Sequence, residues 1–139
     1  MNMGYGGIAK KVSEDKTHVL YAYGDFNLNI PGLENKDHRC DGILLIAKKC
    51  FIGPEIYQKI KRMPSGKKKL ITKAIIRSVD VEAPLHNGLI EIKNSSFAWN
   101  FYHEPEGQKI EIMARRTLEK IFEEYQRTGT IPEVTEWIA

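Results

Sequence analysis

Alternating hydrophobic and polar positions dominate the first part of the chain and predict β-strands. Two such segments, 8–12 and 17–23, are joined by the polar residues 13–16, which suit a hairpin connection. In the second segment Val19, Tyr21 and Tyr23 alternate with residues that are also partly apolar. A continuous apolar run over 43–47 predicts a further short strand.

The segment that follows favours a short helix over 54–62. Pro54 suits the first helical position, and Glu55 suits the first turn beside the positive end of the helix dipole. Three residues at helical spacing, Ile56, Tyr57 and Ile60, would form its apolar face, and the turn-forming residues 63–66 would end it. Residues 70–77 fit a helix by spacing and a strand by their β-branched content, and we favour a strand.

The later part of the chain predicts two strands and one long helix. Asn87-Gly88 is a strong turn signal before a strand over 89–92. After a turn at 94–96, the alternating residues Phe97, Trp99 and Phe101 predict a strand with three rings on the face that covers the core.

A helix is predicted over 106–127, where apolar residues recur at helical spacing opposite a charged face. Gly129 and Pro132 mark its end, and Val134 and Trp137 are expected to anchor the tail. A helix with one apolar stripe needs a surface to cover, and the sheet is the natural one. We therefore expect one α+β domain over 1–139: an antiparallel sheet of about five to six strands, packed by the long C-terminal amphipathic helix and one short helix.

Composition limits the class of protein. The chain is 42% hydrophobic and 28% charged, which is typical of a folded domain and argues against disorder. No apolar run approaches the roughly 18–20 residues of a membrane-spanning helix, and the first residues lack a signal-peptide core. Two cysteines, Cys40 and Cys50, do not make a disulfide framework. We therefore expect a cytoplasmic protein with no membrane partner.

Charge is unevenly distributed and indicates two candidate contact surfaces. Eight cations and no acid lie between positions 59 and 77, so the rest of the chain has a net charge of −5. Such a basic stripe attracts phosphate backbones or an acidic protein, although a solvated surface has the same composition. The second candidate is a polar stretch over 24–42, longer than most loops. The interface candidates are Asp25, Asn27, Asn29, Glu34 and Asp37 in this stretch, and Arg62, Lys67, Lys68 and Lys69 in the stripe.

Catalytic chemistry has only fragmentary support. Glu91 and Lys93, with a second acid from Asp80 or Glu82, are the residue types of a Mg²⁺-dependent nuclease, but any half-buried strand with a polar face shows the same pattern. His38 and Cys40 are too close in sequence for a zinc pair, and no second pair exists. We therefore expect no catalytic residue, no metal site and no cofactor.

The chain as a whole resembles the small α+β immunity proteins of bacterial polymorphic-toxin and contact-dependent growth inhibition systems. The segments that carry the resemblance are 21–23, 41–43, 53–56, the turn 63–66 and the closing stretch 121–129. The resemblance implies a non-enzymatic cytoplasmic protein that neutralises a cognate toxin domain by tight protein–protein association. A nucleic-acid-binding protein using the stripe 59–77, and the nuclease with Glu91 and Lys93, remain the alternatives. The sequence leaves the binding surface, the toxin and the oligomeric state open.

Overall fold

A five-stranded antiparallel sheet forms the centre of the protein. The computed structural model describes residues 3–103 and 109–139. The strand order of the five-stranded sheet is β6-β3-β2-β1-β9. The bounds are β1 Tyr5–Glu14, β2 His18–Asn27, β3 Gly42–Ala47, β6 Ile90–Lys93 and β9 Val134–Ile138. The expected α+β class is confirmed, as are the hairpin between the first two strands and the strands near 43–47 and 89–92.

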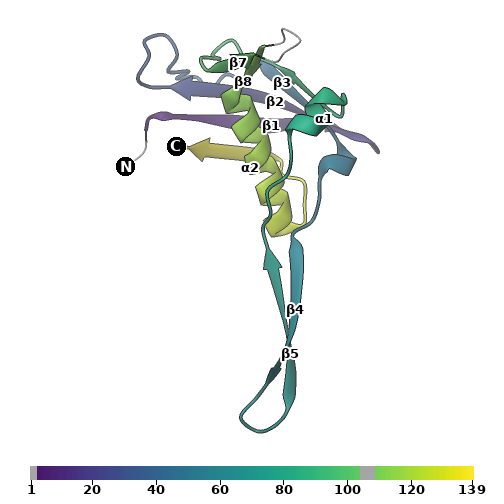
Figure 1. Cartoon of the computed structure of the whole chain (residues 1–139). Helices are drawn as coiled ribbons and strands as arrows, with labels where there is room; N and C mark the ends of the chain where they lie inside the picture. The colour runs from purple at the N-terminus through teal and green to yellow at the C-terminus, as the bar shows by residue number, and fades with distance from the viewer. Residues whose placement is uncertain (1–2, 104–108) are drawn as a thin grey trace.

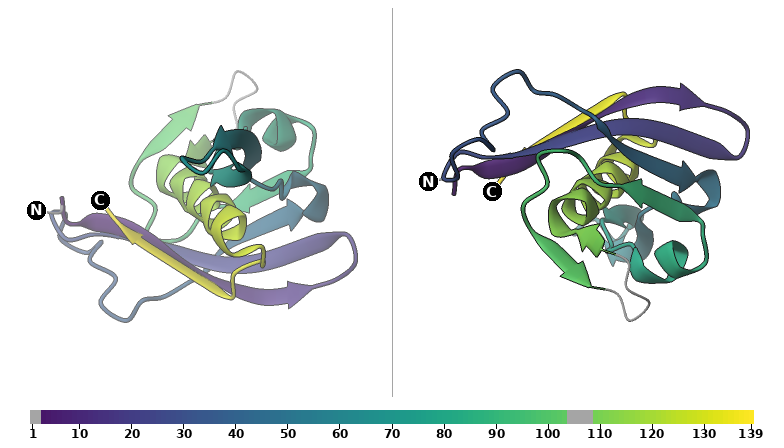
Figure 2. Two further views of the ribbon diagram at one scale, coloured as in Figure 1. Left: turned by 90° about the horizontal axis from the view of Figure 1, so that it is seen from below. Right: turned by 90° about the horizontal axis from the view of Figure 1, so that it is seen from above.

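One long helix, α2 (Ile112–Thr128), covers one face of this sheet (Figures 1 and 2). Its stripe of Ala114, Leu118, Ile121 and Phe122 is buried against inward-facing side chains of the sheet. The sheet contributes most of the remaining core residues, which include Val19, Tyr21, Tyr23, Leu44, Ile46 and Ile90. Gly129 ends the helix with a φ of 75°, a left-handed conformation that glycine adopts without strain, as the sequence predicts.

Smaller elements surround the helix at the β6 edge and at one end. They are η1 (Lys48–Cys50), α1 (Glu82–His86), β7 (Phe101–His103) and β8 (Lys109–Glu111), and the last two pair with each other. The last strand, β9, pairs with β1, and its Trp137 donates a hydrogen bond of 2.9 Å from Nε1 to Thr117 Oγ1 of α2. The tail is therefore anchored at Trp137 as expected, whereas Val134 is 47% exposed.

The remaining two strands form a separate hairpin. Strands β4 (Glu55–Arg62) and β5 (Lys68–Ile75) pair only with each other, and Figure 1 shows them extending away from the rest of the protein. We call residues 55–75 the arm. The prediction of a helix over 54–62 is wrong, because eight residues of this segment pair with β5 along their whole length. The preference for a strand in the segment that follows is confirmed.

Two other expectations need correction. Residues 94–100 form no strand, so Phe97 and Trp99 do not lie on one strand face with Phe101. The Trp99 ring instead packs edge-on against the Tyr5 ring, at 5.4 Å between centroids. The long helix begins only at Ile112, because residues 109–111 pair with β7; positions 106–108 of the predicted helix lie outside the described residues.

The polar stretch over 24–42 is shorter as a loop than expected. Strand β2 continues to Asn27, so the connecting loop spans 28–41. Asp25 and Asn27 therefore lie in the sheet, and each is at most 5% exposed. Figure 2 shows the loop on the face of the sheet opposite α2.

Candidate interaction site

The arm has two chemically different faces, which its strand register defines. Side chains alternate between faces along a strand, and directly paired residues share a face. The pairs Tyr57–Lys73, Lys59–Ile71 and Lys61–Lys69 therefore lie on one side, which we call the lysine face. The pairs Ile56–Ala74, Gln58–Thr72 and Ile60–Leu70 lie on the other side, the apolar face, which ends in the pair Arg62–Lys68.

The apolar face of the arm is open to solvent. Ile56, Ile60 and Leu70 are 57%, 65% and 58% exposed, respectively. No residue of β4 or β5 is buried. A two-stranded hairpin is marginally stable by itself, and clustered exposed apolar side chains mark interaction surfaces on proteins. The arm is therefore the strongest candidate contact surface in the described part of the chain.

The arm also concentrates positive charge. The arm contains seven cations and one acid, Glu55, so its net charge is +6. The whole chain has a net charge of +3, so the residues outside the arm have a net charge of −3. Three of the four stripe residues chosen from the sequence, Lys67, Lys68 and Lys69, lie next to the turn at its tip, and Arg62 pairs with Lys68. The structure thus brings all four together, on both faces of one exposed hairpin.

A tight turn closes the tip. Gly66 N donates to Met63 O at 2.9 Å and Met63 N donates to Lys67 O at 2.7 Å. Pro64 occupies the second turn position, which its fixed φ suits, and Gly66 has a φ of 83° that favours glycine. The predicted turn at 63–66 is confirmed, although it joins two strands and does not end a helix.

The base of the arm is held to the body by hydrogen bonds that Arg77 forms with α2 and with the segment before β4. Gln126 of α2 accepts from Arg77 N at 2.8 Å and donates to Arg77 O at 2.9 Å. Arg77 Nε in turn donates to Gly53 O at 3.0 Å, just before β4. The two chain segments that enter and leave the arm are therefore joined at Arg77, which Gln126 holds to α2.

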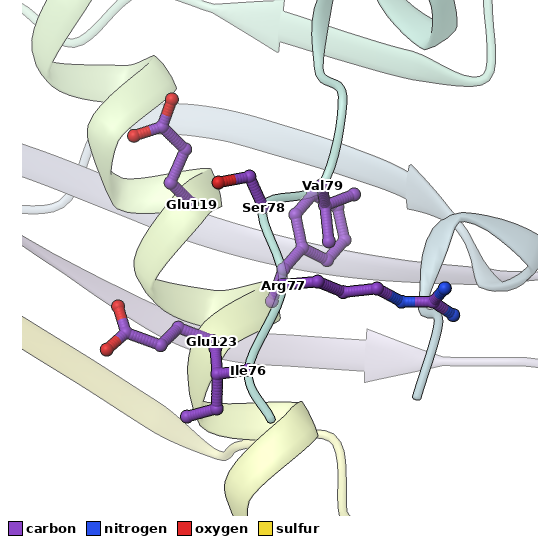
Figure 3. A pocket seen from close by; sticks show the side chains of 7 residues that line it. Ile76, Arg77, Ser78, Val79, Glu119 and Glu123 are labelled. Atoms are coloured by element: carbon purple, nitrogen blue, oxygen red, sulfur yellow. The ribbon is translucent and has the colours of Figure 1, made fainter. Parts of the chain in front are cut away.

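A small hollow lies beside this base. It encloses about 250 Å³ between α2 and the segment after β5. In Figure 3 Glu119 and Glu123 line it from the helix, whereas the Arg77 side chain points away from them. Glu123 is paired with Arg127 and Lys120, and Glu119 lies 4.0 Å from Arg115.

The other interface candidates are divided between the loop and the core. Asn29, Glu34 and Asp37 lie in the loop over 28–41, where Asn29 Nδ2 donates to Met3 O and Glu34 accepts from Gly32 N. Figure 1 places this loop at the end of the body remote from the arm, so the two candidate surfaces do not form one site. Asp25 and Asn27 are buried and do not contribute to an exposed contact surface.

Asp25 belongs instead to a buried acid pair that the sequence did not suggest. It lies beside Glu111, and the two side chains are 1% and 0% exposed. Tyr23 Oη donates to Glu111 Oε2 at 2.8 Å and accepts from Ser95 N at 2.9 Å. Both Asp25 oxygens and Glu111 Oε1 are buried without a hydrogen-bond partner among the described residues, a setting that disfavours the charged form of each carboxyl. Burial, reinforced by Glu111, holds the pKa of Asp25 well above its usual range, and burial also raises the pKa of Glu111.

The residues of the nuclease alternative are not assembled. Glu91 and Lys93 are exposed on β6, on the side opposite the helix-facing Ile90 and Ile92. Glu82 pairs with Arg115 of α2 at 2.7 Å, on the helix side of the sheet. Asp80 accepts a hydrogen bond from the backbone N–H of Glu82, the first residue of α1.

Cys40 lies in the loop after β2 and Cys50 is buried in η1; both are free thiols. Among residues 3–103 and 109–139 no three His, Cys, Asp or Glu side chains are grouped to hold a metal. No helix in this part of the chain is long and apolar enough to span a bilayer.

Comparison with protein-family models, with curated proteins and with solved structures finds no match. The exposed apolar face and the charge of the arm are therefore the features that bear most directly on function.

Proposed function

We propose that this protein is a non-enzymatic binding protein that neutralises a toxin domain by tight association, with the arm as its main contact. One observation carries the proposal: the apolar face of the arm, with Ile56, Ile60 and Leu70, lies in solvent. A partner that covers this face removes apolar surface from water, which stabilises the complex. Binding of this kind needs no catalytic group in the protein itself.

The charge of the arm supports a protein partner of complementary surface. Lysines on the opposite face and at the tip would steer and orient an acidic partner. The anchored base also favours tight binding, because an arm held by Gln126 and Arg77 loses less conformational freedom on association.

The first test is purification of the tagged full chain from its own cells, with nuclease treatment and mass spectrometry of whatever is recovered near one-to-one. The informative variant is Ile60→Ser/Leu70→Ser, which removes the apolar face of the arm. Its matched control is Val12→Ser/Ile138→Ser, since Val12 and Ile138 are 61% and 62% exposed on the body.

The proposal requires three results. The recovered protein arrests growth when expressed alone, the wild-type chain restores growth, and the arm variant fails where the control succeeds. Recovery of no protein partner, or of one that is harmless when expressed alone, would contradict neutralisation.

Nucleic-acid binding is the second candidate, and the +6 charge of the arm favours it. A two-stranded ribbon fits the major groove of duplex DNA, and phosphate contacts release counterions. Binding to a 24-base-pair duplex, followed by fluorescence anisotropy, would then fall about tenfold or more between 50 and 200 mM salt. Replacing Lys67, Lys68 and Lys69 by Gln should abolish this binding, whereas Lys16→Gln/Lys49→Gln on the body should not. Weak binding unaffected by the arm substitutions would eliminate this candidate.

A further inference from the structure

The arm has exposed side chains on both faces and at its tip. Tyr57, 59% exposed, lies on the lysine face, and Ile60, 65% exposed, lies on the apolar face. The turn over 63–66, which joins the two strands at the tip, is exposed as well. Since Figure 1 shows the whole hairpin clear of the body, a partner can reach both faces and the tip at once.

The distribution of charge changes along the arm. Near the tip the pair Lys61–Lys69 lies on one face and the pair Arg62–Lys68 on the other, with Lys67 in between. Nearer the base the cations Lys59 and Lys73 are confined to the lysine face. The tip is thus cationic all round, whereas the shaft is cationic on one side and apolar on the other.

A flat partner surface does not match this pattern. It would cover one face and leave the other either as exposed apolar surface or as unpaired cations. The phosphates of a nucleic acid would pair with the cations of the arm. They would not bury the apolar side chains of Ile56, Ile60 and Leu70, which need an apolar surface against them. A cleft that surrounds a ribbon only two strands wide satisfies both faces and the tip together.

We propose that the partner is a protein with an acidic cleft, and that the arm enters this cleft tip first. The tip cations meet carboxylates at the closed end, the lysine face meets an acidic wall and the apolar face meets an apolar wall. This inference rests on the proposed function and deepens it, because a filled cleft is closed to the partner's own substrate.

Site-specific photocrosslinking in cells tests the geometry of insertion. The photoreactive residue p-benzoylphenylalanine replaces Tyr57, Ile60 or Ser65 in the full chain, one position at a time. These positions report on the lysine face, the apolar face and the turn, and all three are exposed. Replacement of Val12 on the body provides the control. Lysates are treated with nuclease before the crosslinked peptides are mapped by mass spectrometry.

Insertion predicts that all three arm positions crosslink to one protein and that Val12 does not. The Ser65 crosslink should fall within a segment rich in Asp and Glu. With that protein purified, Lys61→Gln/Lys69→Gln should weaken binding at least tenfold at 50 mM salt and much less at 500 mM. Lys16→Gln/Lys49→Gln, at two exposed positions outside the arm and the loop over 28–41, should leave the affinity unchanged.

The other outcomes overturn the inference in distinguishable ways. Crosslinks from Ile60 alone indicate flat docking, and crosslinks to a second copy of this chain or lost on nuclease treatment indicate a different occupant. If a toxic partner co-purifies but no arm position crosslinks to it, insertion is wrong and neutralisation stands. If no partner protein is recovered at all, both proposals fail.

Discussion

The side-chain amide of Gln126 brackets the backbone of Arg77: Oε1 accepts from Arg77 N at 2.8 Å and Nε2 donates to Arg77 O at 2.9 Å. Residue 126 lies in the last turns of α2, and residue 77 is the second after β5. Through this pair, and the bond from Arg77 to Gly53, the helix that covers the sheet also sets the direction of the arm.

Gln126→Ala should therefore loosen the arm at its base. The substitution leaves the Arg77 N–H and C=O without their partner, at a cost of about 1–2 kcal/mol in the free energy of unfolding. Hydrogen exchange of the amides in β4 and β5 should accelerate more than that of β2. Lys120→Ala, an exposed change on the same helix, is the control. Equal protection of the arm in both variants would show that Gln126 does not hold it.

Two buried tyrosines allow a matched comparison of hydrogen-bond loss. Tyr23 Oη accepts a hydrogen bond from Ser95 N and donates one to Glu111 Oε2, whereas within the described residues Tyr21 Oη makes a single hydrogen bond, to Pro132 O at 2.6 Å. Tyr23→Phe should therefore cost about 2–3 kcal/mol in urea unfolding, and Tyr21→Phe about 1 kcal/mol. The reverse order would mean that the hydroxyl of Tyr23 does not stabilise the acid pair.

The Asp25–Glu111 pair makes stability depend on pH. The folded pair keeps a proton above the pKa of about 3.8 that Asp25 has in the unfolded chain, since burial raises its pKa. Above pH 4 the folded state therefore binds more protons than the unfolded state, and the free energy of unfolding falls as pH rises. Asp25→Asn keeps a neutral, hydrogen-bonding side chain without this titration.

Chemical unfolding of Asp25→Asn between pH 5 and pH 8 checks this expectation. The variant should show a flatter pH dependence than the wild type, with an advantage of at least about 1 kcal/mol at pH 8. Asp37→Asn, in the exposed loop, should follow the wild-type curve. A variant curve merely displaced by a constant amount would contradict the raised pKa of Asp25.

Local patterns predicted much of the sheet, and tertiary pairing decided the rest. The hairpin at 13–16, the strand near 43–47 and the stop at Gly129 follow from turn chemistry and periodicity within a few residues. Residues 54–62 carry a valid helix-start signal, but Ile56 and Ile60 also share one face of a strand, and pairing with β5 stabilises that alternative. For such short apolar patterns, periodicity alone does not decide.

The sequence likewise predicts one part of the candidate site and not the other. The cluster of Arg62, Lys67, Lys68 and Lys69 was visible as a charge run, but its display on both faces of a ribbon depends on strand register. The sequence predicts an exposed loop at Asp25, because Gly24 and the polar residues after it are typical of a loop. Its partner Glu111 is 86 positions away, and no local pattern connects residues at that separation.

The body should fold without the arm. Glu55 and Ile75 are directly paired across the base, so a two-residue Asn-Gly turn in place of residues 56–74 joins them without strain. The arm contributes no residue to the buried core cluster, and the hydrogen bonds at Arg77 lie outside the deleted segment. We therefore expect the free energy of unfolding to change by less than about 1 kcal/mol, because shortening a loop alters closure entropy only slightly. Circular dichroism and urea unfolding check the fold, and the growth assay on the same variant should show complete loss of neutralisation. A shortened chain that is folded and still protects cells would move the contact surface to the loop over 28–41.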